Sequence, residues 1–275
     1  MANQYVLILF FFMWYLLVVV SFLFIISGID DLFFDFFYWF RYFRRIRKTR
    51  NYEPLTYEVL SKTPEKAIAI MTPCWHEANI IEAMLKHNCY AIDYKNYDIF
   101  VGVYPNDPDT VKSVQAVAAT DSHVHCVIGP NPGPTNKASN LNIIYEYIKN
   151  YSKENNITYE IFVLHDSEDI IHPLSLKLYN HLIPRVDMIQ IPVFPLEVSN
   201  FEFTHWVYND EFAESHTKDI IVRESIRGLV PSAGVGTAFA RIPLESLTVT
   251  NGGKPFSTAT LTEDYSTALQ LRAAG

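Results

Sequence analysis

The chain has 275 residues, of which 49% are hydrophobic and 19% are charged, so an intrinsically disordered protein is a poor fit. Thirty acidic residues against 22 basic ones give a net charge of −8, which argues against a nucleic-acid partner. The three cysteines cannot pair completely and form no C-x-x-C motif. This excludes a disulfide scaffold and a cysteine zinc knuckle, and it suits a reducing compartment.

The first 29 residues contain no charged side chain, and residues 5–26 form an apolar run interrupted only by Ser21. A helix over that run would be about 33 Å long, enough to cross the hydrocarbon core of a membrane. A cleaved signal peptide is the alternative, but no basic residue precedes the run and no A-x-A site follows it. The sequence therefore predicts a single retained transmembrane helix over residues 1–29.

The segment after this span predicts its orientation. Six basic residues follow closely, at Arg41, Arg44, Arg45, Arg47, Lys48 and Arg50. Positive charge stays on the cytoplasmic side, so the N-terminus should face outward and the remaining chain should be cytoplasmic. The stretch DDLFFDFFYWFRYF combines aromatic and acidic residues, which suits the headgroup interface better than a second span. We expect an interfacial aromatic and basic segment over residues 30–54.

Residues 55–275 have the composition of one α/β domain. Short apolar runs predict strands at 67–71, 99–104, 125–128, 161–165 and 188–193. Amphipathic stretches predict helices at 77–88, 108–120, 136–150, 172–183 and 203–226. This alternation predicts a mostly parallel sheet covered on both faces, in which ligands bind at the carboxyl ends of the strands.

Polar residues follow the first two strands. Glu77 can accept hydrogen bonds from a ribose or a base, or it can simply be an acid at a helix N-terminus. Asp107 can bind the imide N–H of uracil, or it can belong to a turn in which Asp109 caps the next helix. His123 and His125 share a strand face, but without a third ligand nearby they are interpreted as structural.

The fourth strand leads into Asp166, Glu168 and Asp169. Three carboxylates in four residues repel one another unless a cation lies among them. Asp166 and Glu168 point to the same side of an extended segment, and such an oxygen-only pair suits Mg or Mn together with substrate phosphates. The alternative is a solvated acidic loop.

Two further segments are candidates for an acceptor side. Residues 231–237 form a loop of small residues that matches neither G-x-G-x-x-G nor a Walker motif, so it allows close backbone approach without indicating a dinucleotide or a P-loop. Farther on, Thr262, Glu263 and Asp264 precede a helical run. An acid there can be a catalytic base or only a helix N-terminal charge.

Taken as a series, these motifs resemble family 2 glycosyltransferases with the GT-A fold, a Rossmann-like mixed sheet that binds nucleotide-diphospho-sugars. Within that family they resemble the inner-membrane, phage-adsorption type. The resemblance covers roughly residues 65–275, and its main segments are PNDPDT, GPTNKASNLN, LHDSEDIIHP, QIPVFPLE, GLVPSAGVGTAFAR and LTEDY. A nucleotidyltransferase, which has a similar fold, is disfavoured because TPCWHEAN contains neither Lys nor Arg.

The resemblance implies a role for each motif. On the donor side, Pro73 and Glu77 line the nucleotide pocket, Asp107 reads the uracil ring and Lys137 lies near the phosphates. Asp166 contacts the nucleotide sugar, and Glu168 ligates the metal with it. On the acceptor side, the loop residues are Ser232, Gly234, Gly236 and Thr237. Asp264 is the catalytic base, held by Glu263 and Thr262.

The function implied is a membrane-anchored inverting glycosyltransferase that uses a UDP-sugar, an N-acetylhexosamine donor, and Mg or Mn. Its acceptor is a growing cell-envelope polysaccharide or a lipid-linked acceptor. The place implied is the bacterial inner (cytoplasmic) membrane, with an outer-membrane export or receptor partner. The alternative is a catalytically incomplete protein that binds nucleotide sugars and acts as a scaffold in an envelope polysaccharide or phage-receptor system.

The sequence departs from the family pattern in two places. Asp-Ser-Glu stands where Asp-x-Asp is usual, and glutamate can still bind a metal. The sequence also stops at Gly275, without the Q-x-x-R-W element, the further spans or the cyclic-di-GMP-binding domain that the resemblance implies. We therefore expect the glycosyltransferase domain to be truncated at its C-terminus and the chain to be an N-terminal fragment.

Overall fold

The structure, a computed structural model, describes residues 2–196 and 202–274. The chain divides into two compact units, each made of two segments. The first comprises Met1–Tyr52 and Leu196–Gly228, and the second comprises Glu53–Pro195 and Leu229–Gly275. Each unit is described by itself below.

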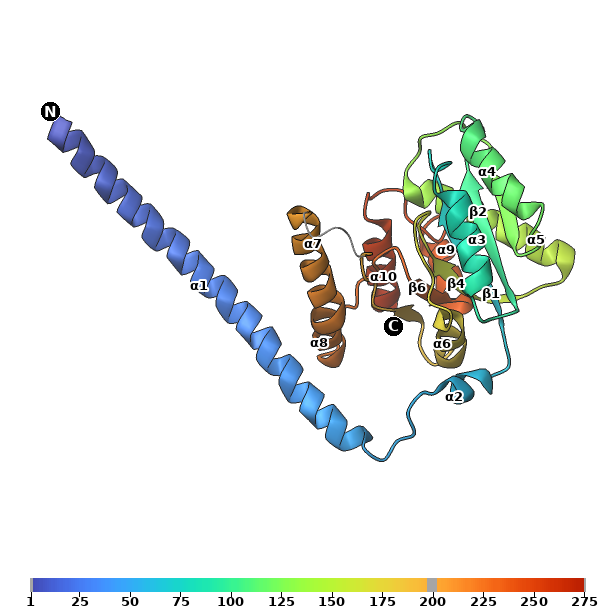
Figure 1. The fold of residues 1–275 in the computed structure, drawn as a ribbon, viewed down its shortest axis with the longest axis horizontal. Coiled ribbons are helices and arrows are strands. Elements are labelled where there is room, and N and C mark those ends of the chain that lie inside the picture. Colours follow the sequence, from blue (N-terminus) through green and yellow to red (C-terminus); the bar gives the residue numbers. More distant parts are fainter. Residues whose placement is uncertain (1, 197–201, 275) are drawn as a thin grey trace. The chain divides into compact units, whose positions relative to one another are not determined.

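The first unit is helical. Its long helix α1 (Ala2–Thr49) continues without a break through the predicted boundary at residue 29, so the aromatic and basic segment prolongs the apolar helix (Figure 1). By length and composition α1 can cross a membrane. The second helix of the unit comprises α7 (Phe203–Glu214), a π-helical turn (Ser215–Asp219) and α8 (Ile220–Ser225). It is joined to α1 by Lys218, whose Nζ lies 2.7 Å from Asp35 Oδ1 and also pairs with Glu214.

The second unit is built on a six-stranded sheet of order β3-β2-β1-β4-β6-β5. Neighbouring strands from β3 to β4 run parallel, whereas β6 is antiparallel to both β4 and β5. The strands are β1 (Ala67–Pro73), β2 (Tyr97–Val103), β3 (Val124–Ile128), β4 (Tyr159–Leu164), β5 (Met188–Gln190) and β6 (Thr237–Ala240). The expected GT-A-like mixed α/β sheet is therefore confirmed. The sequence pattern missed only β6, which has just four residues.

Seven helices accompany the sheet in the described part of this unit: α2 (Tyr57–Ser61), α3 (Ile81–Ala91), α4 (Pro108–Ala118), α5 (Lys137–Asn155), α6 (Ser175–Leu182), α9 (Arg241–Thr250) and α10 (Glu263–Ala274). Polar caps explain where two of them begin. Asn136 accepts a hydrogen bond from Ser139 N at 2.8 Å and starts α5 at Lys137. Asp107 caps α4 in the same way, followed by Pro108 at the first helical position.

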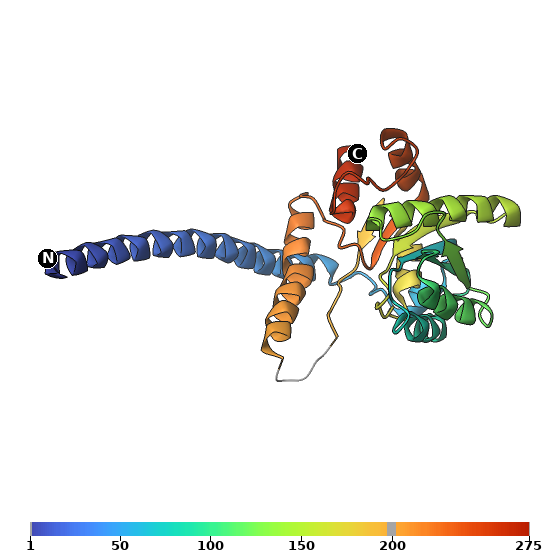
Figure 2. The same ribbon diagram turned by 90° about the horizontal axis from the view of Figure 1, so that it is seen from above.

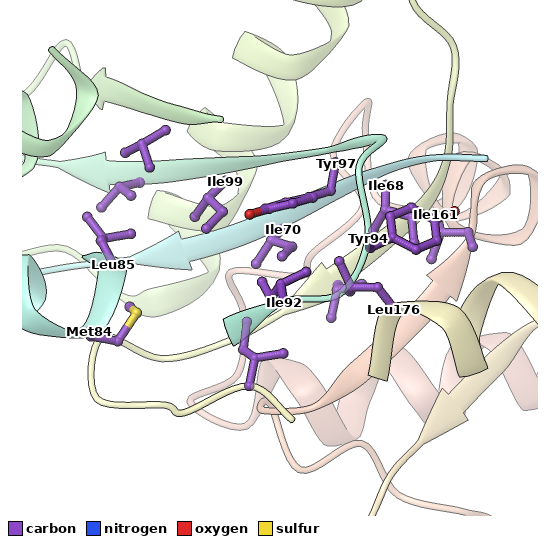
Figure 3. Close-up of a cluster of buried hydrophobic side chains, with 14 of the residues drawn as sticks. Ile68, Ile70, Met84, Leu85, Ile92, Tyr94, Tyr97, Ile99, Ile161 and Leu176 are labelled. Atoms are coloured by element: carbon purple, nitrogen blue, oxygen red, sulfur yellow. The ribbon is translucent and has the colours of Figure 1, made fainter. Parts of the chain in front are cut away.

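The alternation of side chains along the strands fills a core on each face of the sheet. On β1, Ile68 and Ile70 join one cluster with residues of α3, α4 and α6, part of which is shown in Figure 3. Ala69 and Met71 join the other cluster, with residues of α5 and α9. Figure 2 shows α5 on one side of the sheet and α3 and α4 on the other. Because both faces are covered, the exposed carboxyl ends of β1, β2 and β4 are the positions available for a site.

Candidate functional site

A cavity of about 280 Å³ opens at the carboxyl ends of β1 and β4. It collects five of the residues predicted for a donor site, namely Pro73, Glu77, Lys137, Asp166 and Glu168. Pro73 is the last residue of β1, Lys137 is the first residue of α5, and the two acids follow β4. The parallel register of β1 and β4 brings these separate segments together.

The three carboxylates of the acidic loop after β4 differ in position: one bonds within the loop, and two line the cavity. Asp169 turns back, and its Oδ2 accepts a hydrogen bond from Asp166 N at 2.9 Å and lies 3.0 Å from the ring Nδ1 of His165. It therefore fixes the loop, while Asp166 and Glu168 line the cavity. Asp169 thus supports the loop that carries Asp166 and Glu168, the pair that the sequence singled out.

Charge in the cavity is unevenly balanced. Lys137 Nζ lies 2.5 Å from Asp166 Oδ1. Burial raises the pKa of the Glu168 carboxyl, as do the charges of Asp166, Glu77 and Asp169, and Lys137 opposes this only in part. A divalent cation would relieve that repulsion, so the donor set fits Mg or Mn. Among the described residues no group of three His, Cys, Asp or Glu could hold a metal, so two carboxylates would act together with phosphate and water.

One wall of the cavity is aromatic, and sequence reasoning did not single it out. The rings of Trp75 and Tyr104 meet edge to face with centroids 5.1 Å apart. The Tyr104 hydroxyl lies 2.6 Å from Thr135 Oγ1, and Asn140 completes this side of the lining. The signal available in the sequence was an aromatic residue just after each of two strands. Such rings can stack on a nucleobase.

The structure places Asp107 beside this cavity but outside its lining. Its carboxylate is buried, accepts a hydrogen bond from His76 N at 2.7 Å, and caps α4 through Thr110 N. Burial alone would raise the pKa of Asp107, but hydrogen bonds from Thr110 and from the His76 backbone hold it below its usual range. The expectation that Asp109 caps this helix was wrong, because Asp107 does so. The predicted contact between Asp107 and uracil stays a prediction.

The small-residue loop is anchored by Gln190, a residue that sequence reasoning did not select. Its Oε1 accepts hydrogen bonds from Ala233 N at 2.8 Å and from Thr237 Oγ1 at 2.6 Å, and its Nε2 donates to Val235 O. Ser232 Oγ also lies 2.9 Å from Thr237 Oγ1. The predicted acceptor residues Ser232 and Thr237 are thus buried supports of the loop. Within it, Gly234 and Gly236 have positive φ.

The small-residue loop lies against Asp264, the predicted base, at Gly234. A Cβ at this glycine would lie 2.8 Å from Asp264 Oδ2 and 3.3 Å from Lys137 Nζ. Since Lys137 also pairs with Asp166, the cavity and the small-residue loop are adjacent. Asp264 Oδ1 accepts a hydrogen bond from Tyr265 N at 2.7 Å, at the start of α10.

The two residues expected to hold Asp264 differ in exposure. Glu263 is buried, and burial raises the pKa of its carboxyl, with Lys137 opposing and Asp264 adding to the effect. Thr262 is exposed, and its carbonyl accepts the hydrogen bond from Ser266 N that starts the helix. In the described part of the chain, the hydrogen bond that holds the Asp264 carboxylate comes from the Tyr265 backbone.

We predict that Gln190→Leu destabilises the second unit, because the Ala233 amide and the Thr237 hydroxyl lose their shared acceptor. A buried donor without a partner costs about 1–3 kcal/mol, so the melting temperature should fall by roughly 2–12 °C. Gln115→Leu is the matched control, since Gln115 is exposed on α4. Equal melting temperatures for the two variants would show that the Gln190 bonds do not stabilise the loop.

Comparison with known proteins gives a consistent result. The family model described as "Glycosyltransferase like family 2" matches residues 64–275. Two proteins of Escherichia coli strains, both named as a bacteriophage adsorption protein B, are each 45% identical to this chain over 251 residues. The match covers 91% of this chain and 34% of each of those proteins. The chain therefore spans about a third of the length of these relatives.

Solved structures give weaker matches. A mannosyltransferase from Pyrobaculum calidifontis in complex with GDP-Man and Mn²⁺ matches with a TM-score of 0.47 at 21% identity, covering 76% of this chain and 52% of that one. Glucosyl-3-phosphoglycerate synthase from Mycobacterium tuberculosis in complex with UDP matches with a TM-score of 0.40 at 16% identity, covering 70% and 64%.

Proposed function

The chain belongs to the glycosyltransferase-like family 2, as its series of motifs predicted, and on that premise we propose the reaction that its site performs. The proposed reaction transfers an N-acetylhexosamine from a UDP-sugar, with inversion, to a growing cell-envelope polysaccharide or a lipid-linked acceptor. The observation that carries this proposal is the meeting of Asp264, Gly234 and Lys137 beside the Asp166 carboxylate. A group that can accept a proton thus lies next to a cavity suited to a diphosphate.

The donor cavity offers a distinct partner for each part of UDP. Trp75 and Tyr104 provide aromatic surfaces for the base in the cavity of about 280 Å³. Glu77 lines the same cavity and would accept hydrogen bonds from the ribose. Lys137 supplies the positive charge for the phosphates, and it is held at the start of α5 by the Asn136 cap.

Asp166 and Glu168 would hold Mg or Mn, because a cation would offset the repulsion among the carboxylates around the cavity. Such an ion offsets the negative charge that develops on the departing diphosphate. The chain's own residues then have defined tasks. Asp166 contacts the nucleotide sugar, Lys137 neutralises phosphate charge, and Asp169 keeps the acidic loop in place.

On the acceptor side, Asp264 accepts the proton of the attacking hydroxyl, which makes its oxygen nucleophilic. That oxygen forms a bond to the anomeric carbon as the bond from this carbon to the UDP oxygen breaks. Attack opposite the leaving group inverts the anomeric configuration. Glycines at positions 234 and 236 let the loop backbone approach the acceptor closely.

The proposed location is the bacterial inner membrane, with α1 as its single span and the second unit in the cytoplasm. The basic residues after the apolar part of α1 support this orientation. Because the two Escherichia coli relatives are named for phage adsorption, we also propose that this chain has a partner in the cell envelope that takes part in phage adsorption.

Calorimetric competition on the detergent-solubilised chain tests the donor class. In the presence of Mn²⁺, we expect UDP and UDP-N-acetylhexosamines to bind and GDP to bind at least tenfold more weakly, because the proposed donor is a uridine nucleotide. The change Trp75→Ala should weaken the binding of UDP by about 1–3 kcal/mol, the usual free energy of stacking a base on an aromatic side chain. Equal binding of GDP and UDP would contradict the assignment of a uridine donor.

A further inference from the structure

Hydrogen bonds join three loops beside the aromatic wall of the proposed donor cavity. Between the loops after β1 and β2, His76 N donates to Asp107 Oδ2. The third loop, residues 129–136, connects β3 with α5 and is held by Asn106, which follows β2. Asn106 binds both backbone polar atoms of Gly133: its Oδ1 accepts from Gly133 N at 2.7 Å, and its Nδ2 donates to Gly133 O at 2.9 Å. Asn106 thus fixes the loop of residues 129–136 next to the end of β2.

Gly133 lies so close to the two rings of the wall that a side chain on it would displace one of them. A Cβ at this position would lie 2.6 Å from Trp75 Cζ3 and 2.8 Å from Tyr104 Cγ. Optimal contacts between carbon atoms are about 3.5–4.0 Å long, so both distances are far too short. The φ of Gly133 lies outside the left-handed region. Glycine is therefore required here by contact with the rings and not by backbone strain.

The loop of residues 129–136 also reaches the cavity itself. Thr135 and Lys137 line the cavity, and Thr135 Oγ1 lies 2.6 Å from the Tyr104 hydroxyl. Trp75 is half-buried and belongs to the same lining, whereas Gly133 does not. Gly133 therefore contacts the aromatic wall from outside the cavity.

We propose that Gly133 and Asn106 are positioning residues for the nucleobase of the donor. Asn106 holds the loop against the wall, and the absent side chain of Gly133 leaves the Trp75 ring at the cavity, where it can stack on the base. Because Lys137 follows Gly133 by four residues, the same loop fixes the spacing between the wall and the lysine for the phosphates. The inference rests on the proposed nucleotide donor and assigns residues that act through the wall. A wall fixed before binding lowers the entropy cost of ordering the site around the nucleotide.

The first test compares Gly133→Ala with Gly129→Ala in the detergent-solubilised full chain. Gly129 is the matched control, because the nearest neighbours of a Cβ there would lie at an ordinary 3.5 Å. Binding of UDP and of inorganic pyrophosphate with Mg²⁺ is measured by calorimetry, and pyrophosphate reports on the phosphate part of the site alone. We expect Gly133→Ala to bind UDP roughly tenfold more weakly but pyrophosphate as tightly as wild type. Gly129→Ala should match wild type with both ligands.

A second set of variants asks whether Gly133 acts through the tryptophan. In a Trp75→Ala background there is no indole ring to displace, so Gly133→Ala should lose most of its effect on UDP affinity. Asn106→Ala should also weaken UDP binding and spare pyrophosphate, because the loop loses both bonds that hold it. Asn131→Ala, at an exposed residue of the same loop, is its control and should leave UDP affinity unchanged.

Three results would overturn the inference while leaving the proposed function in place. They are a wild-type affinity for UDP in Gly133→Ala, an equal loss of UDP and pyrophosphate binding in that variant, and a full effect of Gly133→Ala without Trp75. If Gly133→Ala does not fold by circular dichroism, Asn106→Ala decides the question, and unchanged UDP affinity there would overturn the inference. A wild-type chain that binds pyrophosphate but not UDP would contradict the nucleotide donor itself, and this inference with it.

Discussion

Asp264→Asn is expected to lower sugar transfer by about 10²–10⁴-fold while UDP affinity stays unchanged. The amide keeps the shape of the side chain and its acceptor for Tyr265 N, but it cannot take the proton of the acceptor hydroxyl. Turnover would be measured as UDP release from a UDP-N-acetylhexosamine by membranes carrying the full chain. UDP affinity would be measured by calorimetry on the same variant.

Asp109→Asn is the matched control for this experiment. Asp109, like Asp264, is an acid in the first turn of a helix, so its replacement reproduces the loss of a helix N-terminal charge. We expect this control to keep its turnover. If Asp264→Asn lost UDP binding together with transfer, Asp264 would be a donor-site residue. If it kept both, the base would have to be another residue.

The second large effect is expected at Gly234. Alanine at this position has an unfavourable positive φ of 74°, and its Cβ would lie 2.8 Å from Asp264 Oδ2. The methyl group must therefore displace the carboxylate, and displacement of a reacting group by about 1 Å can cost about 10²-fold in rate. We therefore predict that Gly234→Ala lowers turnover by about 10²-fold, as measured with the same UDP-release assay.

Gly252→Ala separates this contact from the backbone strain. Gly252 has a similar φ of 65°, but a Cβ there meets nothing within 4 Å. Both changes should cost about 1–2 kcal/mol and lower the melting temperature by roughly 2–8 °C. Only Gly234→Ala should also reduce transfer. Equal turnover in the two variants would contradict the placement of Asp264 against the loop.

The sequence predicted most of the sheet because its strands are short apolar runs followed by polar turns. In β1, for example, Ile68, Ala69, Ile70 and Met71 are all buried, as expected for a strand covered on both faces. The four residues of β6 carry no such signal, since their pairing with β4 depends on contacts distant in the sequence. The continuity of α1 past residue 29 was also missed, because the charges that suggested a boundary are compatible with a helix.

The candidate site shows the same limit. Glu77, Lys137, Asp166 and Glu168 could be selected because carboxylates and lysine after strands suggest phosphate and metal chemistry, and the structure gathers them in one cavity. The supporting residues carry no comparable signal. The role of Gln190 is apparent only when β5 lies beside the loop that it anchors. For Asp169, only the folded loop shows that its carboxylate turns back toward the Asp166 backbone.

The most direct test of the central claim is UDP binding to the detergent-solubilised chain with Mn²⁺ and after its removal by a chelator. Asp166→Asn and Glu168→Gln are compared with Glu154→Gln, a change at an exposed residue of α5, and circular dichroism checks that all are folded. We predict that wild type and Glu154→Gln bind UDP only with the metal, and that both cavity variants lose this binding. A folded wild-type chain that ignores UDP under every condition, or binds it equally without metal, would contradict the assignment of the cavity as a metal-dependent donor site.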